Sequence, residues 1–193
     1  MLQHKIINIF CKLLWFPIVF SEKIYWFVKR NIQTQDFKNC GKDVFISRHC
    51  YFSGNIYFGN DIYVGQGCRF QSTLSKIVIG DHVMFGPDVS IHGGNHRIDV
   101  VGKFMKEITL NEKRPEDDLD IFIENDVWIG SGAVILQGIT IGEGSIVGAN
   151  SVITKSIPPY TIIVGSKPQK SWERWDSETI KLHKEKLSKR ISF

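Results

Sequence analysis

The side chains best suited to chemistry in this chain are its six histidines and four cysteines. A histidine with a pKa near 6.5 can accept a proton at neutral pH, and its ring nitrogens can also bind a metal ion. His96 closes the motif GGNH and stands directly before a long stretch of charged residues. His82 and His92 fit corner positions of a sequence repeat described below and need no catalytic explanation. The other histidines lie in no recognisable pattern: His4, His49 and His183.

The cysteines do not form a metal-binding motif, because no CxxC pair occurs among them. Cys50 and Cys68 occupy equivalent positions of the repeat, so we expect them to be neighbours in the interior. Their proximity would permit a disulfide on geometry alone. We favour two reduced core thiols, because small buried residues suit this position and nothing in the sequence indicates a secretory context.

Residues 123–158 repeat every six residues, as IENDVW, IGSGAV, ILQGIT, IGEGSI, VGANSV and ITKSIP. An aliphatic residue opens each unit, and a small or apolar residue follows four places later. A hexapeptide period is typical of parallel β-helices. Each unit supplies one short strand and a turn, so three units make a triangular coil of about 18 residues, and coils stack at about 4.8 Å.

The same register occurs earlier, in residues 46–75 and, after three extra residues at 76–78, in residues 79–96. The two blocks predict an all-β fold, a parallel β-helix of about five coils. Strands of a β-sandwich would instead alternate between two faces and turn about every 8–12 residues. Many units have glycine after the aliphatic residue, which we attribute to unusual backbone angles at tight corners: Gly59, Gly65, Gly80, Gly86, Gly130, Gly142 and Gly148.

The repeat divides the chain into a hydrophobic segment, 1–43, the β-helix, 44–165, and a C-terminal tail, 166–193. The β-helix is interrupted at 97–122, and a loop of this length is usually functional or disordered. The many charges of this loop suit a solvated arm that reaches a neighbouring subunit or a polar acceptor.

A C-terminal α-helix is predicted over residues 172–190, where acids come early and lysines late, as the helix dipole prefers. Asp176 or Ser177 is suited to be its N-cap. The net charge of +4 is mild, and no basic run is interleaved with aromatic residues. These features predict no nucleic-acid partner.

Residues 5–28 are the most hydrophobic part of the chain. Their longest uncharged run, Leu13–Ser21, is shorter than the about 20 residues that a membrane-spanning helix needs. A signal peptide is disfavoured, because no small-x-small cleavage site follows clearly. We predict two short amphipathic helices with two alternative roles. They either cap the open edge of the first coil or rest on a membrane surface through their aromatic side chains.

Three stretches of the sequence together resemble one family: IGDHVMFGPDVSIHGGNH (79–96), the run from VWIG to SIPP (127–159) and VGSKP (164–168). They resemble the hexapeptide-repeat O-acetyltransferases, which include galactoside, maltose and nodulation-sugar acetyltransferases. The resemblance covers roughly residues 44–170. It implies a left-handed β-helix, an exception to the usual right-handed crossover. It also implies a homotrimer with an active site between adjacent subunits, acetyl-CoA as the acetyl donor, and no metal.

The resemblance assigns the catalytic base to the histidine that ends the block before the long loop, which is His96 here. A sugar hydroxyl is a poor nucleophile until a positioned base removes its proton, and such a base typically contributes about 10²–10⁴-fold in rate. Asp99 follows closely and is a candidate to orient the imidazole.

The same resemblance identifies residues that contact the coenzyme. Trp128 is expected near the thioester end of the donor, and Ser131 and Ala149, about one coil apart, on the coenzyme face. A lysine suits phosphate as a point charge. The residues expected near the nucleotide end are Thr154 and Lys155, with Lys170 and Arg174 as weaker candidates to bind the 3′-phosphate, because the segment after VGSKP diverges from the family pattern.

Two departures from the family concern the acceptor. Arg97 stands where the family often has proline, and residues 1–43 do not match the N-terminal helical domain of the galactoside and maltose enzymes. The hydrophobic N-terminus is more similar to enzymes that acetylate capsule, exopolysaccharide or O-antigen sugars. We therefore predict a cytoplasmic acetyl-CoA-dependent O-acetyltransferase that acts on a sugar of a surface polysaccharide or its precursor. In this interpretation residues 5–28 contact the inner face of the membrane.

Other functions remain open. The same fold could acetylate the nitrogen of an amino sugar or an antibiotic. A non-catalytic β-helix scaffold is disfavoured, because the histidine, the small-residue face and Lys155 occur together. A zinc site of the carbonic-anhydrase type would need histidines from several subunits, and the ten-residue spacing of His82 and His92 does not repeat a coil.

Overall fold

The computed structural model describes residues 15–17, 19–28, 37, 39–101, 103–166 and 168–191. The chain divides into two compact units, residues 1–36 and 37–193. The second unit contains all the described strands and helix α2 (Ser177–Ile191). All the predicted site residues lie in this second unit.

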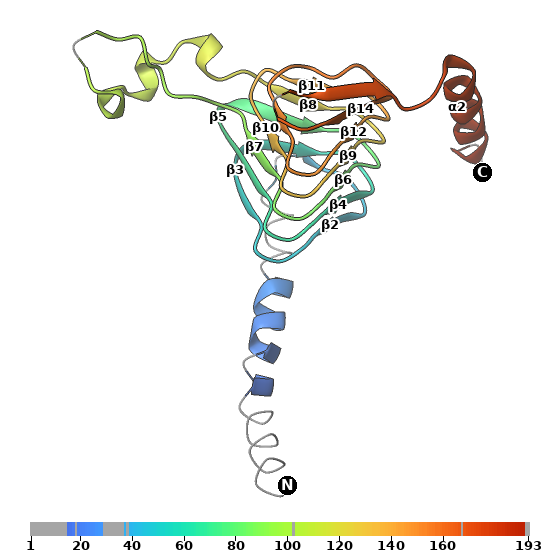
Figure 1. Ribbon diagram of the computed structural model, residues 1–193. Coiled ribbons are helices and arrows are strands. Elements are labelled where there is room, and N and C mark those ends of the chain that lie inside the picture. Colours follow the sequence, from blue (N-terminus) through green and yellow to red (C-terminus); the bar gives the residue numbers. More distant parts are fainter. Residues whose placement is uncertain are drawn as a thin grey trace, which may run out of the picture. The chain divides into compact units, whose positions relative to one another are not determined.

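Parallel pairing arranges the strands in three faces of a coil (Figure 1). The long strands β3 (Tyr51–Phe58) and β5 (Arg69–Ile79) continue around a corner, so one sheet supplies two faces. Face 1 consists of the second halves of β3 and β5 with β1 (Asn39–Cys40), β8 (Ile121–Ile123) and β11 (Thr140–Ile141). Face 2 consists of β2 (Val44–Ile46), β4 (Ile62–Val64), β6 (Met84–Phe85), β9 (Trp128–Ile129), β12 (Ile146–Val147) and β14 (Thr161–Val164). Face 3 consists of the first halves of β3 and β5 with β7 (Ser90–His92), β10 (Val134–Ile135) and β13 (Val152–Ile153).

The predicted parallel β-helix is confirmed, but the chain makes about six turns instead of about five. The sequence count began at residue 46 and missed the first coil, in which Asn39 and Cys40 already pair with β3. It also stopped before β14, where the hexapeptide pattern has faded although the strand still pairs with β12. The left-handed sense of the coil remains what the family resemblance implies.

The side chains that point into the coils form one continuous core. The aliphatic residue that opens each unit of the second block is buried: Ile123, Ile129, Ile135, Ile141, Val147 and Ile153. Burying a side chain of this size typically contributes about 1.5–3 kcal/mol. Cys50 and Cys68 are buried free thiols, as predicted.

The three extra residues of the first block lie earlier than the sequence indicated. The register between β3 and β5 shifts at the corner, so the additional residues fall between Gln71 and Lys76. Their predicted place, 76–78, is wrong, because Ile77 is a buried core residue of β5. Hydrophobic residues on both sides of the insertion fit the period, so the sequence alone could not place it.

The corners are formed by two kinds of residue. Apart from glycines, left-handed backbone angles occur mostly at Asp, Asn and His, including His82 (φ 60°), whereas His92 ends strand β7 and is not at a corner. The glycines that follow the aliphatic openers do not have positive φ, so our attribution to unusual angles is wrong. A Cβ on Gly130 would lie 2.6 Å from the backbone N of Ala149. These glycines therefore allow one coil to approach the next.

The C-terminal end of the chain packs against the solenoid. Strand β15 (Lys170–Glu173) pairs antiparallel with β14 and ends face 2. Of the two predicted N-cap candidates of α2, Asp176 is the N-cap, since its carboxylate accepts a hydrogen bond of 2.8 Å from a backbone N–H of the first turn. Lys184 Nζ of α2 lies 3.0 Å from Glu143 Oε2 at the corner between faces 1 and 2.

In the first unit, residues 15–17 and 19–28 are helical. Large hydrophobic side chains of this helix are exposed, among them Trp15 (65%) and Phe27 (60%). None of the described helices is both long and apolar enough to cross a lipid bilayer. The earlier part of the predicted helical segment, 5–14, lies outside the described residues.

Candidate active site

His96 lies at the start of the loop that connects β7 to β8. Its side chain is exposed and makes no hydrogen bond or ion pair with any other described residue. The chain reaches it through Gly93, where a Cβ would lie 2.6 Å from Ser75 Oγ. The Ser75 hydroxyl donates a hydrogen bond to the carbonyl of Gly93. The insertion in β5 thus fixes the backbone just before His96.

His96 is one of the residues that line a cavity of about 440 Å³. Small-molecule sites in proteins typically measure about 300–1,000 Å³. One wall is the chain around His96, and another comes from the 3₁₀ turns η1 (Met105–Glu107) and η2 (Leu110–Glu112). Thr73 of the β5 insertion completes the lining. An unpartnered imidazole at such a cavity can accept a proton from a bound hydroxyl group.

Asp99 does not hydrogen-bond to His96 but to two arginines. Its carboxylate accepts hydrogen bonds from Arg97 Nε at 2.8 Å and Arg114 Nη1 at 2.9 Å. The hydrogen bond from Arg97, with the charge of Arg114, holds the pKa of Asp99 below its ordinary value. Arg97 also donates to the carbonyl of Glu112 at 2.8 Å. Asp99 therefore fixes the residue next to His96 and leaves the imidazole free.

The base of the loop is held by an ion pair that sequence reasoning missed. Lys113 Nζ lies 2.6 Å from both oxygens of Asp118, and these side chains are only 11% and 1% exposed. A Cβ on Gly94 would collide with the Asp118 carboxylate. Asn95 N donates to the carbonyl of Asp117 at 2.9 Å. The predicted solvated arm is thus an ordered structure at its base, and only the unusual density of charges signalled it.

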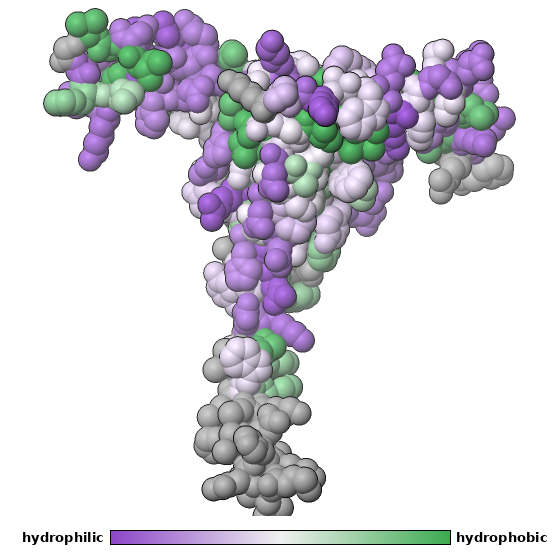
Figure 2. Space-filling view, in the orientation of Figure 1, coloured by the Kyte–Doolittle hydropathy of each residue, from purple (hydrophilic) through white to green (hydrophobic). Residues whose placement is uncertain are grey.

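The outer part of the loop carries exposed apolar side chains. Figure 2 shows hydrophobic groups among hydrophilic ones on this loop. Val101 (99%), Phe104 (79%) and Ile98 (78%) are the most exposed of them. Monomeric proteins rarely leave large contiguous apolar surface uncovered. The loop therefore offers apolar surface to a partner or substrate.

The residues predicted along the coenzyme begin on face 2. Trp128 points outward from β9, half exposed, in register between Met84 and Ile146. Ser131 and Ala149 follow at the corner between faces 2 and 3, and both are exposed. Successive coils are in contact here, since the backbone N–H of Asn150, which follows Ala149, donates to the carbonyl of Ser131 at 2.8 Å. Small side chains at this corner leave the backbone accessible.

The remaining predicted residues lie elsewhere. Thr154 and Lys155 are exposed and follow β13 at the corner between faces 3 and 1. Because β7, β10 and β13 are in register, the loop with His96 leaves from this same corner. Lys170 begins β15, beside the last strand of face 2, and is also exposed.

Within one chain, the predicted residues form two groups separated by face 3. One group is at the corner between faces 3 and 1: His96, Thr154 and Lys155. The other lies on face 2 and at its corner with face 3: Trp128 on the strand, and Ser131 and Ala149 at the corner. A donor that touches both groups must cross face 3 of one chain or lie between two copies.

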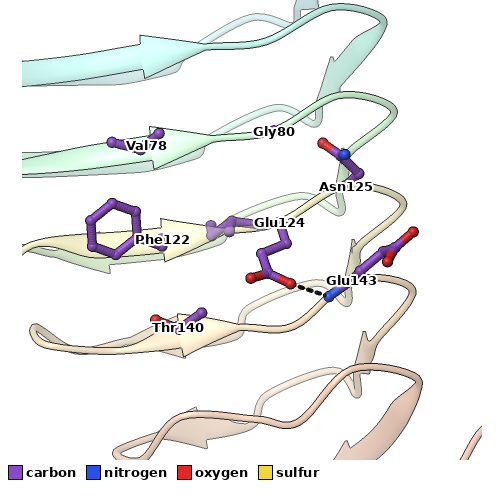
Figure 3. Close-up of a pocket in the computed structure, with 8 residues that line it drawn as sticks. Val78, Gly80, Phe122, Glu124, Asn125, Thr140 and Glu143 are labelled. Carbon is purple, nitrogen blue, oxygen red and sulfur yellow. Dashed lines mark hydrogen bonds between the residues drawn. The ribbon is translucent and has the colours of Figure 1, made fainter.

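A second hollow, of about 490 Å³, lies on face 1 (Figure 3). Val78, Phe122 and Thr140 from successive coils line it, next to the carboxylates of Glu124 and Glu143. Figure 3 shows the Glu124 side chain directed to the backbone N of Glu143, which donates to it at 2.8 Å. Carboxylates ordinarily have pKa values near 4. Without an imidazole, this hollow is less suited to activate a hydroxyl at neutral pH.

Two histidines outside the loop, His82 and His183, have structural partners. His82 Nδ1 lies 2.8 Å from Asp61 Oδ2, and both residues occupy left-handed corner positions. His183 stacks on Trp175, with ring centroids 4.7 Å apart. In the part of the chain that the structure describes, no three His, Cys, Asp or Glu side chains are grouped so as to hold a metal ion.

Comparison of the sequence with known families matches residues 120–155 to the bacterial transferase hexapeptide model of six repeats. A galactoside O-acetyltransferase from Lactococcus lactis is 34% identical over 67% of this chain. The alignment spans 60% of that relative and 55% of a putative acetyltransferase from Schizosaccharomyces pombe. A chloramphenicol acetyltransferase from Morganella morganii is 33% identical over 80% of this chain and 78% of its own length.

Solved structures with the same fold contain acetyl coenzyme A or coenzyme A. A hexapeptide-repeat acetyltransferase from Vibrio cholerae, complexed with acetyl coenzyme A, has a TM-score of 0.61 and 28% identity. The match covers 76% of each chain. A galactoside acetyltransferase in complex with coenzyme A has a TM-score of 0.59 and 27% identity, over 76% of this chain and 70% of the other. Its repeats, its fold and these relatives place this chain in the hexapeptide-repeat transferase family.

Proposed function

We propose that this protein transfers the acetyl group of acetyl-CoA to a hydroxyl of a sugar, in a surface polysaccharide or its precursor. The observation that carries the proposal is His96, whose imidazole has no partner among the described residues and which lines a cavity of about 440 Å³. The relatives are acetyltransferases, and one of them acts on galactosides by name, which supports this reaction and acceptor class.

In the proposed reaction, a ring nitrogen of His96 accepts the proton of the acceptor hydroxyl as its oxygen attacks the carbonyl carbon of the thioester. The tetrahedral intermediate then loses the sulfur, which takes the proton from the imidazolium and leaves as free thiol. Backbone N–H groups are the expected donors to the oxyanion. The donor would lie along Trp128, Ser131 and Ala149, with phosphates near the lysines of the C-terminal coils, Lys155 and Lys170.

We further propose that the working form is a homotrimer in which each site lies between two copies. Two observations support this. The predicted site residues of one chain stand at two different corners, and the loop beside His96 carries exposed apolar side chains such as Phe104. Face 2 also presents outward-facing apolar residues in register, including Tyr63, Met84 and Trp128, each about half exposed.

The hydrophobic N-terminal helix supports a proposed contact with the inner face of a membrane. Its aromatic side chains, such as Trp15 and Phe20, are exposed. Residues 1–30 carry five Lys and Arg and a single Glu, a balance that favours an anionic lipid surface. In this arrangement the enzyme would meet a lipid-linked sugar where it is made.

The test is to incubate the purified protein with acetyl-CoA and a panel of acceptors, and to follow the release of free thiol. The panel contains neutral and acidic sugars, oligosaccharides, an amino sugar and chloramphenicol. We expect thiol release with hydroxylated sugars, and mass spectrometry should find the acetyl group as an ester. Acetylation of nitrogen only, or no acetylated product with any acceptor, would contradict the proposal.

A second candidate is acetylation of an antibiotic. It is favoured by the chloramphenicol acetyltransferase of Morganella morganii, which matches over 80% of this chain. The panel separates the two candidates directly, because an antibiotic-modifying enzyme would prefer chloramphenicol to every sugar by a large factor in kcat/KM.

A further inference from the structure

The cavity beside His96 has an unequal set of charges in its lining. Three cationic side chains line it, those of Arg97, Lys106 and Lys113, together with one carboxylate, that of Glu107. The partners of these groups determine which charge remains for a bound molecule.

Two of the cations are already paired with carboxylates that lie outside the cavity. Arg97 Nε bonds to Asp99 at 2.8 Å, and Lys113 Nζ bonds to both oxygens of Asp118 at 2.6 Å. Neither Asp99 nor Asp118 lines the cavity. These pairs fix the wall and add little net charge to it.

The carboxylate of the lining is also engaged. Glu107 Oε2 accepts a hydrogen bond from the backbone N of Phe104 at 3.0 Å, which closes turn η1. Lys106, on the same turn, makes no ion pair or hydrogen bond with another described residue. Its ammonium group is therefore the cation of this lining that has no carboxylate partner among the described residues and remains available to a ligand.

The rest of the lining suits a sugar. Thr73, Asn95 and Thr109 present polar groups, while Ile108 and Leu110 provide apolar surface. We propose that the acceptor sugar carries an anionic group, a carboxylate or a phosphate, which Lys106 binds while His96 faces the reacting hydroxyl. The proposal rests on the proposed function and defines its acceptor class more narrowly.

Binding of three probes to the full-length protein tests the proposal: glucose, glucuronate and glucose 6-phosphate. Saturation-transfer NMR, without acetyl-CoA, gives their dissociation constants. We expect at least one anionic sugar to bind about tenfold more tightly than glucose, since a hydrogen bond to a charged group contributes about this factor. The preferred anion identifies the carboxylate or the phosphate as the recognised group.

Variants at position 106 assign the effect. Lys106→Met should weaken binding of the preferred anion about tenfold, and Lys106→Arg should retain most of it. The control is Lys186→Met, which removes the same charge from an exposed position on α2. Equal affinity for glucose and both anions, undetectable binding of both anions, or an unchanged Lys106→Met variant would each overturn the proposal. Acetyl transfer is assayed separately, so a neutral acceptor used efficiently would refute this inference and leave the proposed function standing.

Discussion

At the scale of single residues, His96 has an exposed imidazole on a backbone that its neighbours hold in place. The backbone before it is fixed by contacts of Gly93 and Gly94, but the imidazole has no partner among the described residues. Such a side chain can be changed without loss of packing. Its removal should therefore separate activity from stability.

We predict that His96→Asn lowers kcat for acetyl transfer about 10²–10⁴-fold, because the hydroxyl loses its base. The melting temperature should change little, since no described interaction is removed. Steady-state kinetics and thermal unfolding measure the two effects. A variant with unchanged kcat would show that His96 is not the base, whereas a parent protein without measurable acetyl transfer would favour the scaffold interpretation, in which the β-helix serves only assembly.

Gly130 tests the contact between coils. A Cβ there would lie 2.6 Å from the backbone N of Ala149, which no real Cβ tolerates. Gly130→Ala should therefore destabilise the solenoid by about 1–3 kcal/mol, as overpacking typically does. Ser131→Ala, on an exposed side chain at the same corner, should stay within about 0.5 kcal/mol. Urea unfolding curves compare them, and equal midpoints for Gly130→Ala and the parent would refute the close approach.

Local sequence patterns were enough to predict the roles of some residues but not of others. Asp176 could be recognised as an N-cap because its role depends on the next three residues alone. The place of the insertion in β5 depends on which side of a corner the extra residues bulge, and both choices bury hydrophobic residues. One partner of Asp99 is Arg114, which is 15 residues away in the sequence and comes near only in the folded loop.

At the scale of elements, the loop between β7 and β8 is organised by ion pairs near its surface. A hydrogen bond from Lys103, with others from Thr109, lowers the pKa of Glu112 to about 2. The pKa of Asp117 is also lowered, first by the hydrogen bond from the backbone of Arg114. These carboxylates have lower pKa values in the folded loop than in the unfolded chain. They therefore stabilise the loop above their ordinary pKa, near 4, and this contribution is lost as the pH falls toward about 2.

We predict that the loop opens in acid before the solenoid does. Pepsin should cleave within residues 97–113 with increasing rate as the pH is lowered from about 4 to about 2, beyond the change in pepsin's own activity. Lys103→Met should shift cleavage to higher pH, because Glu112 loses its principal partner. Mass spectrometry of the fragments locates the cuts. First cuts within the coils, or identical profiles for parent and variant, would contradict this account.

The order of this loop was beyond sequence analysis for a physical reason. A stretch with so many charges reads as solvated, since isolated charges avoid the interior. Asp118 is nevertheless almost fully buried, because Lys113 neutralises it and Gly94 leaves room for its carboxylate. Three residues from distant parts of the loop create that environment together.

At the scale of the whole molecule, the solenoid was predictable because each hexapeptide repeats the same inward aliphatic position. Its inward aliphatic residues were identified correctly, whereas the end coils were missed and the three extra residues were misplaced. The first and last coils lack neighbours on one side, so their sequences need not keep the full pattern. The proposed assembly of copies, in contrast, depends on outward-facing surfaces, which the hexapeptide pattern does not specify.

The proposed trimer predicts complementation between inactive variants. His96→Ala damages one corner of the chain, and Ser131→Tyr would fill the other. If each site takes one corner from each of two copies, trimers assembled from a mixture should regain activity in about a quarter of their sites. The measurement is kcat after joint refolding, with each variant alone as the control. A mixture as inactive as its components would place both groups in the same chain's site.

The coils above and below the long loop pair directly with one another. Strand β7 is in register with β10, and β5 with β8, although residues 97–120 leave the stack between them. The strand pairing of the solenoid thus continues across the long loop without interruption. The sequence of the loop between β7 and β8 can therefore change while the strand pairs on either side of it are kept. Acceptor choice can then change in one region of the gene without a new fold.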